Sequence, residues 1–231
     1  MATSRILYEL AGANPGLRFS SYCWRSRMAL LHKGLEFETI PWRFTEKKAI
    51  AFSGQGRVPV LVDGGTVIFD SWAIADHLER GYPAAPSLFG GAAGQALTRF
   101  INEFADAVVN PGIARLIVAD IFAVLHEKDR AYFRASREQR FGKSLEEVAA
   151  DRDAAVAPFR QSLDPARRVL ASQAFLGGTS PLYADYILFG SLQWARCVSA
   201  FELLVEDDAL FAWRERLLDL FDGNARRAPR A

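Results

Sequence analysis

The sequence has 231 residues, and 50% of them are hydrophobic, which is enough to bury one large core or two smaller ones. With 28 basic and 27 acidic residues the net charge is +1, so composition gives no electrostatic reason to expect nucleic acid as the main partner. The two cysteines, Cys23 and Cys197, are far apart, which argues against a disulfide framework or a metal site and fits a reducing compartment.

Strand and helix patterns alternate over the first eighty residues. Ser20 stands where the N-cap of the first helix belongs, and Gly34 is a suitable end for that helix because glycine adopts positive φ at little cost. The order of elements predicts a small sheet covered by helices. Strand, helix, strand, hairpin and helix are predicted over residues 5–10, 21–32, 35–40, 58–69 and 71–80.

A segment rich in proline and glycine, residues 84–91, is the predicted linker between a first domain (residues 1–83) and a second (residues 92–231). After the linker the apolar period becomes 3.6 residues, and no strand pattern of useful length follows. The residues from 185 to 201 are apolar nearly all round, which indicates a helix in the centre of a bundle. We therefore expect an all-helical second domain.

The second domain also contains the most apolar stretch of the chain. The helical pattern around it is expected to break or bend at Pro111-Gly112. Residues 112–125 include Arg115 and Asp120, so this stretch is predicted to be too short and too charged to cross a bilayer. We expect a cytoplasmic protein with no membrane partner, and we interpret the basic tail, residues 226–230, as a solvated terminus.

The sequence Phe19-Ser20-Ser21-Tyr22-Cys23 places a serine hydroxyl at a helix start. Unpaired amides and the positive end of the helix dipole stabilise a thiolate there relative to its thiol. A free thiol has a pKa of about 8.5, and each unit by which it falls corresponds to about 1.4 kcal/mol. No nearby histidine could make serine a nucleophile, so we interpret Ser20 as a donor to the thiolate of a ligand. The alternative is that Ser20 is only an N-cap.

Val58-Pro59 lies inside an apolar strand, where proline is unusual because it cannot donate to the ladder. A cis bond here would leave the backbone groups of Val58 facing a groove, where a peptide-like ligand could pair with them. The alternative is an ordinary proline in an edge strand.

Two further features suit a ligand with an amino-acid end. In Asp70-Ser71, Ser71 is expected to cap the next helix, whose free amides suit a carboxylate, while Asp70 could bind an ammonium group. Arg57 could meet a ligand carboxylate through its forked donors. A plain helix cap and a solvated charge are the respective alternatives. No metal site is predicted.

The order of these motifs resembles the glutathione transferases over essentially the whole chain. The family's catalytic Ser, Cys or Tyr looks like Ser20, and its Val-Pro with cis proline looks like Val58-Pro59. Its acidic residue and serine before the next helix look like Asp70-Ser71. The capping motif before its buried helix is similar to residues 183–186, except that Leu182 replaces the usual Ser or Thr, so the reciprocal capping box is lost.

The resemblance implies an α/β thioredoxin-like N-terminal domain, which binds glutathione, and an all-α C-terminal bundle. Residues 19–27, 132–142 and 183–194 also look like the bacterial β-aryl etherases and fungal etherase-like transferases, although Ser21 replaces their usual Pro. The function implied is activation of the glutathione thiol for attack on a hydrophobic, aromatic electrophile, with cleavage of β-aryl ethers as its sharper version and general conjugation as its broader one.

The expected second site is an apolar cleft between the domains. Its candidate wall residues are Tyr22, Trp24, Phe44 and Trp194. Two alternatives stay open: a carrier of glutathione or apolar ligands without catalysis, and a glutathione-dependent reductase or lyase that uses Cys23. Cys23 is otherwise a packed small hydrophobe. The resemblance also implies a homodimer.

Overall fold

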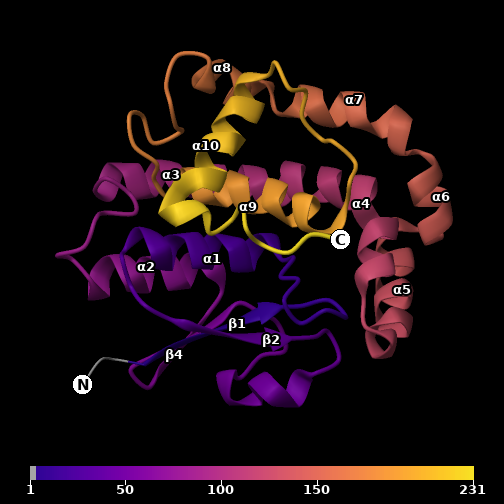
Figure 1. Cartoon of the computed structure of the whole chain (residues 1–231), viewed down its shortest axis with the longest axis horizontal. Helices are drawn as coiled ribbons and strands as arrows, with labels where there is room; N and C mark the ends of the chain where they lie inside the picture. The colour runs from indigo at the N-terminus through magenta and orange to yellow at the C-terminus, as the bar shows by residue number, and fades with distance from the viewer. Residues whose placement is uncertain (1–3) are drawn as a thin grey trace.

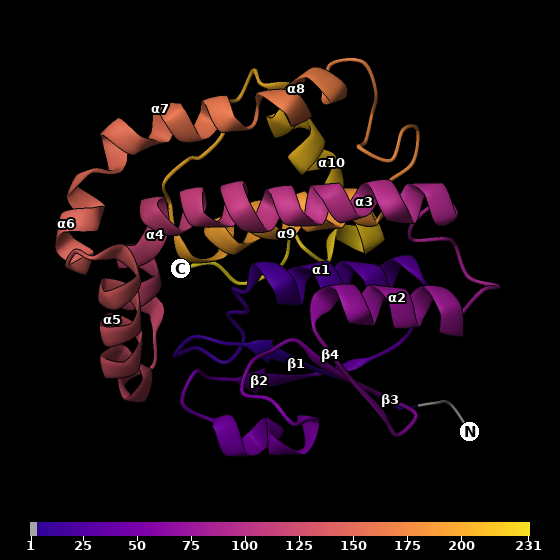
Figure 2. The same ribbon diagram turned by 180° about the vertical axis from the view of Figure 1, so that it is seen from behind.

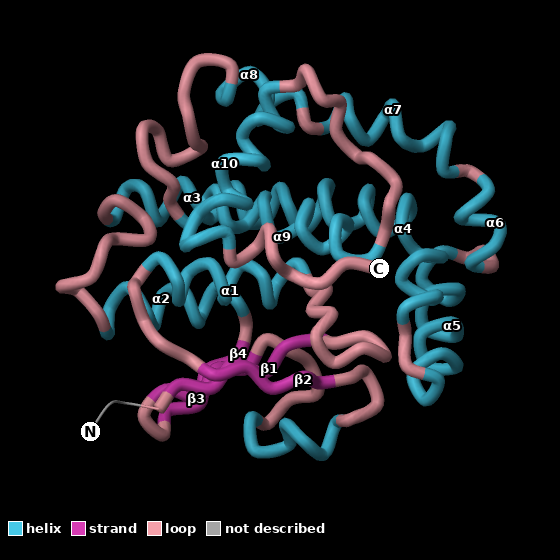
Figure 3. Tube along the Cα trace, viewed as in Figure 1, coloured by secondary structure: helices cyan, strands magenta, loops and turns pink. Residues whose placement is uncertain are grey.

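The computed structural model describes residues 4–231. A four-stranded sheet is covered by two helices, and a helical bundle packs above them (Figure 1). The strand order is β2-β1-β3-β4, with β1 parallel to β2 and antiparallel to β3, and strands occur in the N-terminal part alone (Figure 3). This is the predicted fold class. The strands are β1 (Arg5–Leu10), β2 (Glu38–Trp42), β3 (Val60–Asp63) and β4 (Thr66–Phe69).

Two strands begin later than the sequence pattern predicts. β2 starts at Glu38 rather than residue 35. Glu38 pairs with Ile6, and its neighbour β1 begins at Arg5, so β1 has no residues left to pair with residues 35 and 36. β3 starts at Val60, which pairs with Tyr8, rather than at residue 58. Pro59 lacks the N–H that a ladder needs, so Val58 lies outside the sheet.

Helices α1 (Ser21–His32) and α2 (Ser71–Gly81) cover the face of the sheet that is turned toward the bundle, and a short 3-10 segment, η1 (Lys47–Ser53), lies on the other face (Figure 1). The start of α1 is as predicted, since the Ser20 hydroxyl accepts from the amide of Cys23 at 3.3 Å. Gly34 follows α1 with φ 65°.

The predicted cap of α2 is wrong by one residue. Asp70, not Ser71, is the N-cap: its carboxylate accepts from the amides of Trp72 at 2.9 Å and Ala73 at 3.1 Å. Ser71 is already the first residue of the helix, so its side chain is past the position from which a cap reaches these amides.

One continuous helix crosses the bundle (Figure 2) and consists of α3 (Ala92–Phe104), a π-helical turn η2 (Ala105–Val109) and α4 (Asn110–Val124). The predicted break at Pro111-Gly112 is absent, because Pro111 falls in the first turn of α4 and the π turn precedes it. The π turn directs Asp106 toward α1, where it forms an ion pair with buried Arg25 at 2.8 Å.

The helix Ala92–Val124 has 33 residues and is long and apolar enough, by length and composition, to cross a membrane. The predicted segment, residues 112–125, was too short to cross a bilayer because it is only the last part of this helix. In the structure this helix packs against α9 and the helices that follow it in the chain, as a bundle helix does. The other helices are α5 (Glu127–Phe141), α6 (Leu145–Ala150), α7 (Arg152–Ser162), α8 (Asp164–Leu170), α9 (Tyr183–Val198) and α10 (Ala209–Gly223).

The central helix α9 joins the two parts by packing along α1. Gly190 permits the close approach, since a Cβ at this position would lie 2.5 Å from the backbone carbonyl oxygen of Ser21. The start of α1, which carries Ser20, is therefore positioned directly by the core of the bundle.

The start of α9 has only half of a capping box, as the sequence predicts. The amide of Leu182 donates to Asp185 at 3.0 Å, but a leucine side chain cannot accept in return. Buried Asp185 also accepts from the amides of Leu176 at 2.7 Å and Gly177 at 3.0 Å and from the indole of Trp213 at 2.8 Å. Four donors to one carboxylate compensate for the missing hydroxyl.

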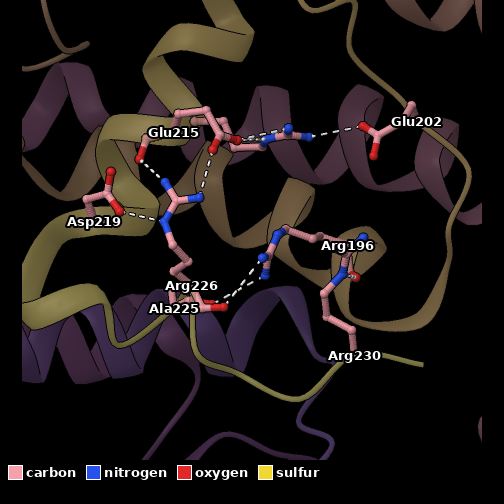
Figure 4. Close-up of polar contacts among 8 residues, drawn as sticks. Arg196, Glu202, Glu215, Asp219, Ala225, Arg226 and Arg230 are labelled. Atoms are coloured by element: carbon pink, nitrogen blue, oxygen red, sulfur yellow. Dashed lines mark hydrogen bonds and ion pairs between the residues drawn. The ribbon is translucent and has the colours of Figure 1, made fainter.

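The arginines of the basic tail are exposed, as expected of a solvated terminus, but the tail also folds back onto α9 and α10 (Figure 4). Arg226 forms an ion pair with Glu215 at 2.9 Å and a second with Asp219. Arg230 donates to the carbonyl oxygen of Arg196 at 3.2 Å. The acidic side chains of α10 thus hold the tail against the bundle.

Candidate active site

A cavity of about 370 Å³ lies between the sheet domain and the bundle. One wall comes from the start of α1 and from the segment before β3, and the other comes from α4, α5 and Trp194 of α9. Both polar and aromatic side chains line the cavity, as in sites that bind small molecules.

Ser20 lies at the cavity wall and is 8% exposed. Its oxygen already accepts from the Cys23 amide, so the hydroxyl proton remains for donation to a group in the cavity. Ser21 also lines the cavity, and sequence reasoning gave it no role. Two adjacent serines at a helix start are the sequence signal that could have placed Ser21 beside Ser20 at the cavity.

Arg57 and Val58 line the same cavity as Ser20. The Val58–Pro59 bond is cis, which the sequence alone could not establish, and Pro59 itself is buried outside the lining. Lys47 is a cation that sequence reasoning missed: it lines the cavity and donates to the carbonyl oxygen of Gly56. Burial lowers the pKa of Lys47, and the neighbouring Arg57 lowers it further.

Asp70 and Ser71 do not line this cavity. Asp70 is exposed and its carboxylate caps α2. Ser71 is buried, and its carbonyl oxygen accepts a hydrogen bond from the hydroxyl of Tyr183 at 2.7 Å. Their contact with the amino-acid end of a ligand stays a prediction.

Three of the four predicted aromatic wall residues, Tyr22, Phe44 and Trp194, line the cavity. Trp24 does not: it is 1% exposed, and its indole donates to the carbonyl oxygen of Arg18 at 3.0 Å, so it belongs to the core. Helix α5 adds Tyr132, whose ring centroid lies 6.0 Å from that of Phe44.

Helix α5 is fixed over the cavity by Asp129 in its first turn. The Asp129 carboxylate is fully buried and accepts from the amides of Phe44 at 3.1 Å and Thr45 at 3.0 Å and from the Thr45 hydroxyl at 2.6 Å. This contact ties the loop after β2 to the bundle, so the two walls of the cavity are joined at this end.

Family models and relatives agree with this arrangement of a sheet domain and a bundle. The model described as "Glutathione S-transferase, N-terminal domain" matches residues 19–80, and the one described as "Glutathione S-transferase, C-terminal domain" matches residues 96–209. The chain belongs to the glutathione S-transferase family.

Individual relatives of the family match to different extents. Glutathione S-transferase Z2 of Arabidopsis thaliana is 34% identical over 117 residues, which are 48% of this chain and 51% of that protein. The chain therefore matches about half the length of this plant relative. The glutathione S-transferase-like protein ustS of Aspergillus flavus is 27% identical. The match covers 95% of this chain and 86% of that protein.

Solved structures of the family superpose over nearly the whole chain. A glutathione transferase of Phanerochaete chrysosporium is 26% identical with a TM-score of 0.76, covering 96% of this chain and 93% of that one. A glutathione S-transferase of Ceriporiopsis subvermispora, crystallised in complex with glutathione, has a TM-score of 0.82 at 21% identity and covers 94% and 98% of the two chains. The latter similarity concerns the fold.

Cys23 does not line the cavity. Its side chain is fully buried, and burial raises the pKa of its thiol to about 12. Such a thiol is scarcely ionised near neutral pH, which argues against Cys23 as an attacking thiolate. Within residues 4–231 no group of three or more His, Cys, Asp or Glu side chains is arranged to hold a metal ion.

Proposed function

We propose that the protein binds glutathione as a co-substrate and activates its thiol for attack on a hydrophobic, aromatic electrophile. The observation that carries this proposal is the position of the Ser20 hydroxyl, which lies at the start of α1 and at the wall of an open cavity. A ligand sulfur in that cavity would meet a hydroxyl donor, free helix amides and the positive end of the helix dipole together.

The residues around Ser20 suit the rest of a tripeptide. The backbone of Val58 lies outside the sheet and lines the cavity, so it is available to a peptide as an added strand would use it. Lys47 and Arg57 also line the cavity, and as cations they suit a carboxylate. We assign Asp70 and Ser71 to the other end of the ligand, as the family resemblance implies.

In the reaction, Ser20 stabilises the sulfur anion after its proton has left to solvent. The sulfur then forms a bond to the electrophilic carbon, and the leaving group departs with the bonding electron pair. Tyr22, Phe44 and Trp194 provide an aromatic wall on which a ring can pack beside the sulfur. A β-aryl ether and an aryl halide are the two substrate types to compare.

Turnover of both substrate types with glutathione tests the proposal. Release of a phenol from a β-aryl ether would support the narrower etherase function, and turnover of the aryl halide alone would support general conjugation. Glutathione affinity without turnover of any electrophile would instead favour a non-catalytic carrier. The alternative of a Cys23-dependent reductase is disfavoured by the burial of that thiol.

We also propose that the protein is a homodimer. Leu97 and Phe100 on α3 are 73% and 72% exposed. Exposed apolar side chains one helical turn apart favour association with a second copy. Sedimentation of Phe100→Glu as a monomer, with the wild type as a dimer, is the expected outcome; a monomeric wild type would refute the assignment.

A further inference from the structure

The far wall of the cavity contains an arginine that has no acidic partner. Arg137 of α5 is half-buried, and its guanidinium lies 4.8 Å from the ring centroid of Phe133 and 5.7 Å from that of Phe44. The hydrogen bond that its guanidinium makes is to the hydroxyl of Ser136, at 3.2 Å. Stacking fixes the guanidinium plane while leaving donors for another group.

Two more arginines share this cavity, namely Arg140 and Arg57. Within the described residues 4–231, no carboxylate lies at ion-pair distance from any of the three. Arg140 and Arg57 are exposed, so Arg137 is the half-buried arginine of the three. Burial lowers the pKa of Arg137, and the charge of Arg140 lowers it further.

We propose that Arg137 and Arg140 bind an acidic group of the electrophile, so that the preferred second substrate is an aromatic acid. This inference rests on the proposed function. The two arginines come from α5 of the bundle, whereas Lys47, Arg57 and Ser20 come from the sheet domain. Both parts of the chain therefore contribute cations to the cavity.

The aromatic residues around the arginines specify the rest of the ligand. Tyr132 and Phe133 line the cavity beside Arg137, so a ring can pack there while its carboxylate meets the guanidinium. A bidentate contact of this kind is directional, and it distinguishes a ring acid from its neutral analogue.

The test compares 4-chloro-3,5-dinitrobenzoate with the neutral 1-chloro-2,4-dinitrobenzene in the full-length protein. For Arg137→Met the ratio of kcat/KM for the acid to that for the neutral compound should fall about 10- to 100-fold, as the loss of a charged hydrogen bond implies. Arg137→Lys should recover part of the ratio. Arg134→Gln is the matched control, since Arg134 is on the same helix but pairs with Glu138 and Glu146 outside the cavity.

A binding measurement separates this inference from the proposed function. Calorimetry of 3,5-dinitrobenzoate, in the presence of saturating S-methylglutathione, needs no turnover. Loss of this binding in Arg137→Met supports the inference even if no electrophile is turned over. An unchanged affinity for 3,5-dinitrobenzoate with an unchanged kcat/KM ratio would overturn the inference, because Arg137 would then not contact the acid. An equal loss of affinity for S-methylglutathione would also overturn it, because Arg137 would then bind the tripeptide.

Discussion

The contact between α1 and α9 predicts a specific result for Gly190→Ala. The added Cβ would lie 2.5 Å from the carbonyl oxygen of Ser21, whereas ordinary contact begins at 3.4 Å, so the two helices must separate by roughly 0.9 Å. The obstacle is backbone and cannot rotate away. Alanine favours a helix by about 1 kcal/mol over glycine, and overpacking costs up to about 3 kcal/mol.

The net loss expected for Gly190→Ala is therefore about 2 kcal/mol in the free energy of unfolding. Because Ser21 follows Ser20, the same displacement moves the hydroxyl at the cavity wall, and glutathione should bind at least about tenfold more weakly. Urea unfolding at fixed protein concentration and calorimetry of glutathione binding measure the two effects.

Gly81→Ala is the matched control for this experiment. Gly81 is the last residue of α2, and a Cβ there would meet nothing within 4 Å, so this variant should be as stable as the wild type or slightly more stable. If Gly190→Ala matches Gly81→Ala in stability and binds glutathione normally, the reasoning that the bundle positions the start of α1 is refuted.

Two further predictions concern buried polar groups. Asp185→Asn should lower the free energy of unfolding by about 3 kcal/mol or more, since an amide cannot accept from all four donors. Trp213→Phe removes one donor and should cost less. Equal losses of the two variants in urea unfolding would contradict this. Cys23 and Cys197 are fully buried with thiol pKa values raised to about 12, so neither should react with a disulfide reagent at neutral pH until the protein is unfolded in urea. Fast reaction of Cys23 in the folded protein would restore the reductase hypothesis.

Local sequence rules predicted the part of the site that local structure determines. The cap of α1 by Ser20 and its end at Gly34 follow from residue types at fixed positions, and both are present. The predicted cap of α2 was displaced by one residue because Asp70 and Ser71 are both good caps, and sequence could not choose between adjacent candidates.

The rest of the site depends on contacts between distant segments. Helix α5 lies in a charged region with weak apolar faces, so its role as a cavity wall was not predicted. Its position comes from Asp129, which bonds the backbone of Phe44 and Thr45 more than eighty residues earlier. Trp24 shows the reverse case: it stands in the right motif, but the turn of α1 directs it into the core.

The pKa of the glutathione thiol in the complex tests the central claim most directly. Ultraviolet absorbance of the thiolate, followed against pH, should give a value below that of free glutathione in the wild type. In Ser20→Ala it should be higher than in the wild type by about one unit, equivalent to about 1.4 kcal/mol, with Ser20→Thr in between. A Ser20→Ala protein that binds glutathione with the wild-type thiol pKa would contradict the account.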